Sequence, residues 1–598
     1  MNRRPVRIEL QHEAHEVIAA ATAKSLPRET GGILLGYHES SAIVVTNALT
    51  IDSDRESTTQ YVRNDAKANK LLEDFLADRA TDDPTGYVGE WHSHPAPAGP
   101  SPIDVNVLRT IAKTSDAPIA LVVCSASLTT PFHGVTAHRQ RFGRTTSRTV
   151  PVISPAPRLQ PLRPLPSTAV RGDGPIFVSY RQTDGTEQAS RIEHLLRATG
   201  LVVWRDYRDL RAGTTTDRLE QALTQGLSAA VLVATPDIVY SEIVRERELP
   251  RLLQLDENAD FSLSIANTIP RRGSFSKCDY DAPDRLLRLS PKRTLADKKQ
   301  TNMLDTMGEL EIARDLLMHR IEQRKPTLRR TNRAFTLRVQ SRPTAFAIDA
   351  DDEDLHIRVN AAENGRLPSA EGLHLLQRTL PLISDAIYAS RAPRVQILGG
   401  AHLSIALALG SALPETKFGL VEVIDTRNGA WGSAACEEDP LDNVVRVDEF
   451  LLPAQQVSGT GTQSKIAIFV GLTPAADSTA FETLISSSRH KFVKAAMVTT
   501  STAQLDPREA GRLSSVIAQQ IKRLAAEYGR AEVHLAFHGP YTMAVLIGRH
   551  LNTLRTVAYE WEDEGGASRY TPALVIDTGS AGGPIAEILL EIDEAPIT

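Results

Sequence analysis

Short apolar runs alternate with amphipathic segments along most of the 598 residues of this chain. Runs such as 31–37 (GGILLGY), 117–124 (APIALVVC) and 176–180 (IFVSY) have the length and composition of buried strands. In the segment 310–321, apolar residues recur at helical spacing, which predicts a helix before Pro326. Strands that alternate with helices are typical of α/β domains, so we expect an α/β multidomain protein.

Two stretches without a sustained period divide the chain into three blocks. Residues 144–174 contain six prolines between Pro151 and Pro166. Because prolines remove backbone donors and favour extended polyproline conformation, this stretch is predicted to be a semi-rigid linker. A second boundary runs from about 256 to 300, where no period is sustained. The expected domains are 1–143, 175–290 and 300–598.

The composition excludes several broad classes of protein. The formal net charge of −6 argues against a protein that coats a long nucleic acid. Cys124, Cys278 and Cys436 are far apart, so neither a disulfide framework nor a cysteine zinc site is expected. No apolar run reaches the ~18 residues of a membrane helix, and the N-terminal Arg pair has no apolar run behind it. We expect a soluble, cytoplasmic protein without a membrane partner.

Two segments in the last block resemble each other. Residues 394–413 and 531–551 each contain an apolar strand, a turn of small residues and an apolar helix. The same nine-residue spacing occurs in both copies, from Ala401 to Gly410 and from Gly539 to Gly548. The repeat predicts a duplicated α/β domain whose halves share one ligand, although repeated α/β units also arise without a shared ligand.

The strongest chemical signal of the chain is a pair of histidines followed by a carboxylate. His92 and His94 lie two apart, so on a strand both imidazoles project from one face. Asp104 returns a carboxylate across a Pro- and Gly-rich loop. Two histidines and one carboxylate with an open fourth position are typical of a catalytic zinc site, where the metal activates water. Glu29 is the candidate general base, and Ser101 is the candidate hydrogen-bond donor to a developing oxyanion.

These five residues also follow a family motif. A glutamate upstream of H-x-H, then a serine and, three residues later, an aspartate, resembles the signature of the JAMM/MPN metalloproteases. Six residues separate His94 from Ser101, at the short edge of the spacing in that family. The resemblance implies a JAMM (MPN) α/β fold, Zn2+ as cofactor and hydrolysis of peptide or isopeptide bonds beside ubiquitin-like modifiers. The alternative is a pair of exposed strand histidines beside a turn aspartate.

In the second block, polar and aromatic residues follow the expected strands. Tyr180 and Arg181 end the first strand, Trp204 and Asp206 end the second, and Gly213 belongs to the next loop. Ligands of open α/β sheets bind beyond the carboxyl ends of the strands, where these residues are expected to converge. The ordered segments F-x-S-Y-R, G-x-x-V-W-x-D, L-x-x-G and S-x-x-V resemble TIR domains. This resemblance implies a flavodoxin-like parallel sheet and NAD+ as a substrate held by these residues.

The TIR resemblance further implies one catalytic glutamate in the next helix. Aligning 241–244 (SEIV) with the family pattern places the acidic position at Arg247, one residue before Glu248. We predict Glu248 as the catalytic residue, with Glu246 as the alternative. A carboxylate suits cleavage of the nicotinamide–ribose bond, because the departing bond develops oxocarbenium character. The rival role for a TIR fold is protein–protein assembly without chemistry.

In the third block, each repeat places a turn at a helix N-terminus, where free N–H groups and the helix dipole favour anions. Aromatic residues nearby are candidates for stacking on bases. The candidate ligand residues are Gly399, Gly400, Ala401, His402, Leu403, Ser404, Trp431, His538, Gly539, Pro540, Tyr541, Thr542, Tyr559, Glu560 and Tyr570. The alternative is that the glycines only make turns and the aromatic residues belong to the core.

The two repeats, together with VAYE at 557–560 and YTPAL at 570–574, resemble the SAVED domain of bacterial antiphage systems. This resemblance implies two fused CARF-type, Rossmannoid halves. It also implies a cyclic oligonucleotide ligand made by a partner nucleotidyltransferase, and we expect a cyclic tri- or tetranucleotide.

Together the three resemblances imply an antiphage effector of cyclic-oligonucleotide (CBASS) signalling. We expect the ligand to bridge the SAVED halves, to drive self-association into an oligomer or filament, and to activate NAD+ hydrolysis by the TIR domain. The JAMM domain is expected to act as a zinc peptidase or deconjugase. One alternative is a ligand-activated JAMM protease in which the TIR domain only oligomerises, and another is a non-catalytic scaffold.

Overall fold

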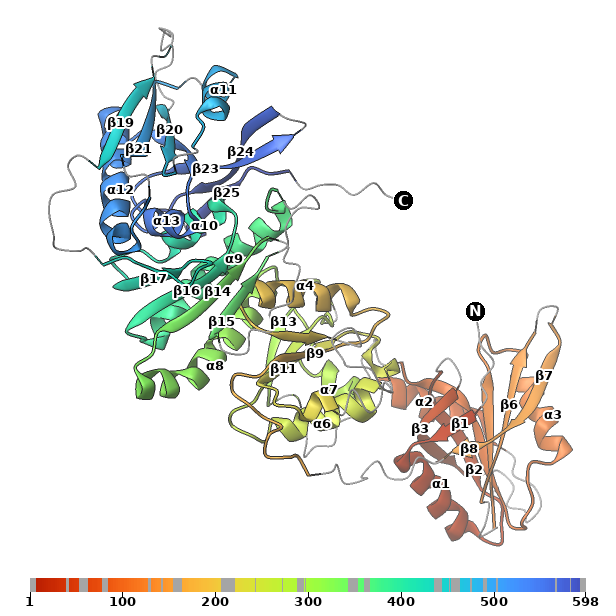
Figure 1. The fold of residues 1–598 in the computed structure, drawn as a ribbon. Helices are drawn as coiled ribbons and strands as arrows, with labels where there is room; N and C mark the ends of the chain where they lie inside the picture. The colour runs from red at the N-terminus through yellow and green to blue at the C-terminus, as the bar shows by residue number, and fades with distance from the viewer. Residues whose placement is uncertain are drawn as a thin grey trace.

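Four β-sheets follow one another along the chain in the computed structural model (Figure 1). The structure describes residues 7–38, 42–52, 63–77, 84–126, 131–140, 143–153, 164–205, 221–241, 243–271, 273–287, 295, 297–342, 353–359, 366–434, 444–450, 452, 463–473, 476–487, 492–501, 504–564, 567–580 and 582–591. Within these ranges, no helix combines the length and the apolar character needed to cross a membrane. The elements confirm the mixed α/β, multidomain architecture predicted from the sequence.

The first sheet has eight strands in the order β7-β6-β5-β4-β2-β3-β1-β8. The strands are β1 Arg7–Leu10, β2 Gly31–His38, β3 Ala42–Ile51, β4 Gly86–His94, β5 Ile119–Ser125, β6 Phe132–Arg139, β7 Thr145–Val150 and β8 Val152–Ile153. Three helices accompany them, namely α1 His12–Ser25, α2 Asp65–Ala77 and α3 Pro102–Ile111.

The helices cover both faces of this sheet. Neighbouring residues of a strand face opposite sides, so Leu34 packs toward α1 while Ile33 and Leu35 pack toward α2. Tyr87 packs against the apolar cluster beneath α2 and also against the cluster beneath α3. Helices α2 and α3 therefore lie on the same face, opposite α1.

Residues 145–153 form strands, so the prediction of a linker over 144–174 is wrong for this part. Strand β7 pairs with β6 at one edge of the sheet, and β8 pairs with β1 at the other edge. Only Pro151 separates β7 from β8, so the sheet curls until its two edges meet there. The missing N–H of Pro151 is not needed at this junction, and its carbonyl accepts a hydrogen bond from the Ile8 N–H at 3.0 Å.

The second sheet has five parallel strands in the order β10-β9-β11-β12-β13. They are β9 Ile176–Ser179, β10 Val203–Arg205, β11 Ala229–Ala234, β12 Ser262–Asn267 and β13 Lys299–Asn302. The helical segments are α4 Thr186–Ala198, η3 Ile238–Tyr240, the π-helix η4 Val244–Glu248, α6 Leu249–Leu255 and α7 Ala282–Leu287. Strand β13 lies beyond residue 290, where the second domain was expected to end. A strand of four residues is too short to give a periodic signal, so the sequence pattern did not indicate it.

Helix α8 (Gly308–Thr331) begins close to the predicted segment but continues through Pro326. Proline costs a helix one backbone hydrogen bond, which is why the sequence favoured a helix before this residue. Leu328, beyond the proline, is buried together with Leu317 and Ile321. Burial of this apolar face outweighs the loss of one hydrogen bond.

The third and fourth sheets form the C-terminal part of the molecule (Figure 1). The third, in the order β15-β14-β16-β17-β18, contains β14 Phe335–Gln340, β15 Leu355–Arg358, β16 Arg394–Gly400, β17 Leu420–Ile424 and β18 Ala430–Gly432. The fourth, in the order β19-β21-β20-β22-β23-β24-β25, contains β19 Val445–Phe450, β20 Lys465–Gly471, β21 Lys494–Thr500, β22 Glu532–His538, β23 Thr556–Glu564, β24 Ala567–Ile576 and β25 Ile585–Ile588. Their helical segments are α9 Ala370–Ser390, α10 Leu403–Ala412, α11 Thr479–Ser487, η5 Pro507–Glu509, α12 Ala510–Glu527 and α13 Tyr541–Gly548.

The predicted repeat is present, and its glycines join the two halves. Strand β16 leads into α10, strand β22 leads into α13, and the two helices pack against each other. A Cβ on Gly410 would lie 2.1 Å from the Val545 carbonyl oxygen, and one on Gly548 would lie 2.3 Å from the Leu407 carbonyl oxygen. Only glycine permits this close approach of the two backbones.

One apolar core continues from the second sheet into the third and fourth. Helix α4 of the second sheet packs against α8 and α9. The Thr379 hydroxyl of α9 donates a hydrogen bond of 3.2 Å to the Ala198 carbonyl at the end of α4. The second sheet is thus packed directly against the duplicated C-terminal part.

Candidate functional site

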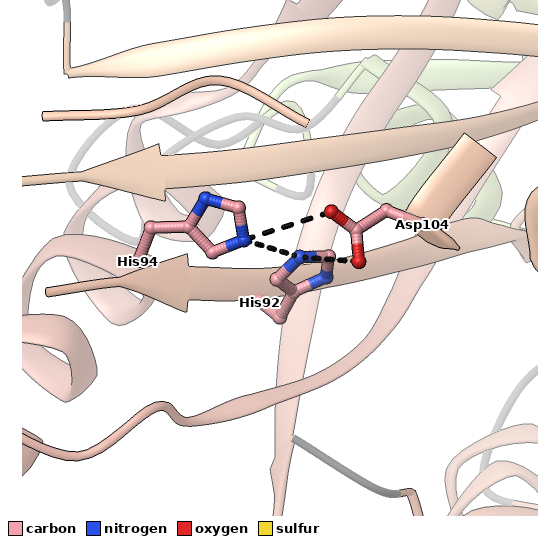
Figure 2. Close-up of side chains that lie close together, drawn as sticks. All are labelled: His92, His94 and Asp104. Carbon is pink, nitrogen blue, oxygen red and sulfur yellow. Dashed lines mark hydrogen bonds and ion pairs between the residues drawn. The ribbon is translucent and has the colours of Figure 1, made fainter. Parts of the chain in front are cut away.

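His92, His94 and Asp104 come together on the face of the first sheet that α2 and α3 cover. One ligand atom from each of the three residues lies within 4.8 Å of the other two. Figure 2 shows both imidazoles and the carboxylate pointing toward one another. The two Nε2 atoms are 3.2 Å apart, and they lie 3.5 Å and 3.6 Å from the oxygens of Asp104.

Local structure explains how each ligand is presented. His92 and His94 alternate with buried residues at the end of β4, so both face the same side. Ser101 caps α3, and Asp104 is the third residue of that helix. The Ser101 N–H donates to the Asp104 carboxylate at 2.6 Å, and the Asp104 N–H donates to the Ser101 hydroxyl at 3.3 Å. This capping box fixes the carboxylate beside the histidines.

The donor set fits a zinc ion. Four ligands at about 2.0–2.2 Å around a tetrahedral metal lie roughly 3.3–3.5 Å from one another, close to the separations between these atoms. The His94 Nδ1–H donates to the Ala98 carbonyl at 3.2 Å, which leaves Nε2 free of its proton for a metal. Burial disfavours ionisation of Asp104, but His92 and the hydroxyl and N–H of Ser101 outweigh it and hold the pKa of Asp104 well below its usual range.

The backbone next to Glu29 is tied to the strand position between the two histidines. The Thr30 N–H donates to the Ser93 hydroxyl at 2.9 Å, and the Ser93 N–H donates to the Thr30 carbonyl at 2.7 Å. In the register of β2 and β4, Gly31 lies opposite His92. Glu29 itself is half-buried, and its role as general base stays a prediction.

A second charged cluster lies on β4 and was not among the predicted sites. Glu90 pairs with Arg63 and accepts a hydrogen bond from the Tyr87 hydroxyl at 3.2 Å. Burial raises the pKa of Glu90, which Arg63 only partly opposes. The two-residue spacing between Glu90 and His92 indicates that both lie on one face of a strand. Their neighbour Arg63 comes from a different segment of the chain, so no local pattern predicts the ion pair.

In the second sheet, the structure brings Glu248 to the carboxyl end of β9. The Ser179 hydroxyl, at the end of that strand, donates to Glu248 Oε2 at 2.5 Å, and both residues are buried. Arg247 is exposed. Glu248 is the last residue of the π-helix η4, in which each turn contains one residue more than an α-helix would. Ser179 was part of the recognised motif but was not predicted as a site residue.

The other predicted residues of this sheet have varied positions. Arg181 pairs with Asp184 at 3.0 Å. The Tyr180 hydroxyl accepts a hydrogen bond from Arg205 Nε at 3.3 Å. Trp204 packs against the core of the second sheet. Asp206, Gly213 and the side chain of Glu246 lie outside the described part of the chain, so the expected convergence beyond the strands stays a prediction.

In the C-terminal part, α10 begins beside β23 of the fourth sheet, and α10 and α13 have different caps. Glu560 Oε1 accepts a hydrogen bond of 2.6 Å from the Ser404 N–H in the first turn of α10. Glu560 is buried, and burial raises its pKa against the opposing contributions of Ser404 and Arg342. At α13, the Tyr541 and Thr542 hydroxyls have no hydrogen-bond partner among the described residues. The first helix end is thus already occupied by a carboxylate, and the second carries two unsatisfied hydroxyls.

The remaining ligand residues of the first repeat lie at the end of β16 and the start of α10. Gly399 has a φ of +94°, and a Cβ there would lie 2.2 Å from the Val339 carbonyl oxygen. His402 is buried, and its Nδ1 lies 2.8 Å from the Ser341 hydroxyl oxygen. Gly400 is the last residue of β16, and a Cβ there would meet nothing within 4 Å, whereas Ala401 is buried and Leu403 is half-buried.

In the second repeat, the half-buried His538 ends β22, and Gly539 and Pro540 lead into α13. Pro540 is the N-cap of that helix. The two repeats therefore place their turns at corresponding sheet edges, which fits a shared ligand.

The three predicted stacking aromatics are core residues, as the alternative reading held. Trp431, Tyr559 and Tyr570 are all buried. Trp431 Nε1 donates to Asp425 at 3.0 Å. The Tyr559 hydroxyl lies 2.8 Å from His534 Nδ1. Without an exposed ring face none of them offers a stacking surface, because the β-strands that carry them turn these rings into the apolar core.

Comparison with known families identifies two of the three parts. Residues 11–139 match Prok-JAB, the prokaryotic homologs of the JAB domain. Residues 375–576 match SAVED, the SMODS-associated sensor domain fused to various effectors. The chain therefore carries a JAB domain, which is JAMM/MPN-like, and a SAVED domain. The TIR assignment of the second sheet stays a prediction.

Among solved structures, Cap4 of Acinetobacter baumannii, a SAVED/CARF-domain containing receptor, was determined with the cyclic trinucleotide 3′3′3′-cAAA. It is 12% identical, with 80% of this chain and 99% of that chain covered and a TM-score of 0.33. Its complex with 2′3′3′-cAAA is 13% identical, with coverage of 80% and 98% and a TM-score of 0.34. DSY2949 of Desulfitobacterium hafniense is 17% identical, with coverage of 25% and 94% and a TM-score of 0.20. No curated protein matches the chain.

Proposed function

We propose that this protein is a CBASS-type antiphage effector in which a cyclic oligonucleotide, bound by the SAVED domain, activates NAD+ hydrolysis at Glu248. The observation that carries the proposal is the position of Glu248, buried at the carboxyl end of β9 and hydrogen-bonded to Ser179 at 2.5 Å. In doubly wound sheets this edge is where ligands bind.

Two further features support a TIR-like second domain. Its parallel strand order, which reads 2-1-3-4-5 along the chain, is the flavodoxin-like order. The π-helix explains why Glu248, and not Arg247, takes the acidic position of the TIR pattern. The extra residue in the turn brings Glu248 to face the sheet and leaves Arg247 exposed. A carboxylate in this position stabilises the positive charge that develops on the ribose as nicotinamide leaves.

The SAVED domain supplies the ligand site of the proposal. The cyclic oligonucleotide lies across the repeat turns after β16 and β22, and the unsatisfied hydroxyls of Tyr541 and Thr542 contact it. Because Glu560 already caps α10, the phosphates bind at α13. A cyclic tri- or tetranucleotide fits two turns that belong to two halves of one domain.

Ligand binding acts on the second domain through the shared core and through self-association. Helix α4 packs on α8 and α9, so a shift of the SAVED halves reaches the second sheet directly. Association of several chains then brings second domains together and completes their sites. Moving the population from 1% to 99% active requires ~5.5 kcal/mol of preference of the ligand for the active state.

A second activity is supported by the geometry of the JAB domain. His92, His94 and Asp104 would hold a zinc ion, which when bound supplies an activated water for hydrolysis of an amide bond. Glu29 takes and returns the proton, and Ser101 hydrogen-bonds the developing oxyanion. A peptide or isopeptide bond beside a ubiquitin-like modifier is the proposed substrate. If the ligand switches on this activity alone, the second domain serves only to oligomerise the chain.

The deciding experiment measures NAD+ in the presence of the purified protein and a panel of cyclic di-, tri- and tetranucleotides. We expect one ligand to trigger NAD+ loss and to enlarge the particle in light scattering. A Glu248→Gln variant should enlarge but leave NAD+ intact. NAD+ that stays constant with every ligand, or is consumed equally by Glu248→Gln, would refute the NADase function. Ligand-dependent cleavage of a protein with NAD+ intact would assign the output to the JAB domain.

A further inference from the structure

A cavity of about 580 Å3 lies between the ends of α8 and α9 and the start of β16 and β17. This is the amino end of the parallel strands, whereas the repeat turns lie at their carboxyl ends. The cavity is therefore separate from the proposed cyclic-oligonucleotide site. Its lining includes Lys325, Tyr388, Arg391, Arg394, Lys417 and Phe418.

The charged side chains that line the cavity are all cationic. Four cationic side chains line the cavity, and no aspartate or glutamate is among the described residues that do so. The carboxylates nearest to these cations lie outside the lining: Glu322 is 2.7 Å from Lys325, Asp385 is 2.9 Å from Lys417, and Glu422 is 3.9 Å from Arg394. Arg391 forms no ion pair within the described part of the chain. Three of the four cations are thus paired, and Arg391 supplies the net positive charge of the cavity.

The backbone at Arg391 shows that an arginine is used where glycine would fit better. Arg391 follows the last residue of α9 with a φ of +55°, in the left-handed region. Glycine or asparagine usually occupies this position after a helix, because other side chains are strained there. Strain of this kind is concentrated at binding sites, where the side chain has a use that offsets it.

Aromatic rings lie beside the cations. Tyr388 is 62% exposed, although it is a large apolar side chain. Lys417 Nζ lies 5.6 Å from the centre of the Tyr388 ring and 5.5 Å from that of Phe418. An exposed ring next to cationic groups is the combination that binds the base and the phosphates of a nucleotide.

The loop that carries Lys417 and Phe418 is held from the other half of the SAVED domain. Arg549, at the end of α13, donates hydrogen bonds to the carbonyls of Leu413 at 3.0 Å and Phe418 at 2.6 Å. The guanidinium is buried, which lowers the pKa of Arg549 to about 10. The cavity wall is therefore preorganised by the packing of the two halves.

The geometry points to a second ligand site in this cavity, for a nucleotide with a polyphosphate group such as ATP. The phosphates pair with Arg391, Arg394 and Lys325, whose guanidinium and ammonium groups suit phosphate oxygens. The base stacks on Tyr388. The volume lies within the range of pockets that hold small ligands of this size.

The test measures binding of mant-ATP, a fluorescent ATP analogue, to the full-length protein by anisotropy, with ATP, adenosine and tripolyphosphate as competitors. Arg391→Gly removes the guanidinium and relieves the backbone strain, so it should not lower the midpoint of thermal unfolding. We expect it to weaken mant-ATP binding about tenfold or more. Tyr388→Ala should weaken ATP and leave tripolyphosphate unchanged.

Arg530→Gly is the matched control, because Arg530 is exposed and has a φ of +59°, yet is not among the residues that line the cavity. It should bind mant-ATP like the parent. No binding by the parent, equal binding by Arg391→Gly and the parent, or equal loss in Arg530→Gly would each overturn the assignment. If tripolyphosphate competes as strongly as ATP, the base contributes nothing to binding, which would overturn both the stacking on Tyr388 and the assignment of a nucleotide as the ligand.

Discussion

Arg245 donates hydrogen bonds from Nη1 to the Tyr37 hydroxyl at 2.7 Å and to the Val239 carbonyl at 2.6 Å. Tyr37 belongs to β2 of the JAB domain, and Arg245 belongs to the π-helix that ends at Glu248. Both residues are buried. The JAB domain thus contacts the helix that presents the candidate catalytic carboxylate.

Tyr37→Phe should loosen this contact while keeping the ring. Loss of one hydrogen bond to a charged group is worth about 1.5–3 kcal/mol. We expect amide exchange over 244–248 to become roughly 10- to 150-fold faster by mass spectrometry. Tyr388→Phe is the control, because the Tyr388 hydroxyl has no hydrogen bond to a described residue. Unchanged exchange in Tyr37→Phe would show that the contact does not hold the π-helix.

Glu248→Gln should lower the rate of ligand-triggered NAD+ loss by about 100-fold or more. The amide carries no negative charge to stabilise the positive charge that develops as nicotinamide leaves. Ser179→Ala should lower the rate by roughly tenfold through loss of its hydrogen bond. Glu257→Gln, an exposed residue of the same domain, is the matched control and should act like the parent. Nicotinamide release measured by chromatography distinguishes these outcomes.

His92→Ala should reduce the zinc content from about one ion per chain to near zero, measured by mass spectrometry of the metal, because two ligands rarely retain the ion. Glu29→Gln should keep the zinc but lose peptide cleavage, since Glu29 moves a proton and is not a ligand in the predicted site. His194→Ala changes a half-buried histidine of the second domain and should leave the zinc in place. Zinc retained in His92→Ala would refute the site.

Gly548→Ala should destabilise the SAVED domain by about 1–3 kcal/mol, because its Cβ would meet the Leu407 backbone. Gly419→Ala is the control, because a Cβ at that position meets nothing within 4 Å. Urea unfolding curves of the two variants provide the comparison. Equal midpoints would contradict the prediction, because they would show that α10 and α13 move apart to admit the added Cβ at little cost in free energy of unfolding.

The stability of the protein should fall as the pH drops below about 6.5. Burial, with Arg358 and Arg338 nearby, lowers the pKa of His356 to about 4. Between these two values the unfolded chain binds a proton that the folded chain does not, so the free energy of unfolding decreases with falling pH. We expect a loss of roughly 2 kcal/mol between pH 6.5 and 4.5. His356→Gln should flatten this dependence in urea titrations, and an unchanged slope would contradict it.

The sequence predicted those features that depend on local periodicity. The two-residue spacing of His92 and His94 placed both rings on one face of a strand, and the spacing to Asp104 placed a carboxylate beside them. The repeated glycines correctly indicated two related halves, although their close packing through Gly410 and Gly548 depends on three-dimensional contact.

Features that depend on distant contacts were missed. Pro151 lies between two strands because both sheet edges need partners, and Pro326 lies within a helix because Leu328 is buried. The rings of Trp431 and Tyr559 looked like stacking surfaces because burial cannot be inferred from aromatic character alone. The cavity beside Arg391 is assembled from three separate segments, so no local pattern marks it.

The closure of the first sheet by residues 145–153 determines where the JAB domain can be cut free. A fragment that stops at residue 143 would leave β1 and β6 with unpaired backbone groups, which invite pairing with other molecules and aggregation. A fragment that extends past Ile153 keeps both edges covered. Dissection of the two proposed enzymes should therefore begin at the prolines that follow Ile153, and not at Pro151, which joins two strands.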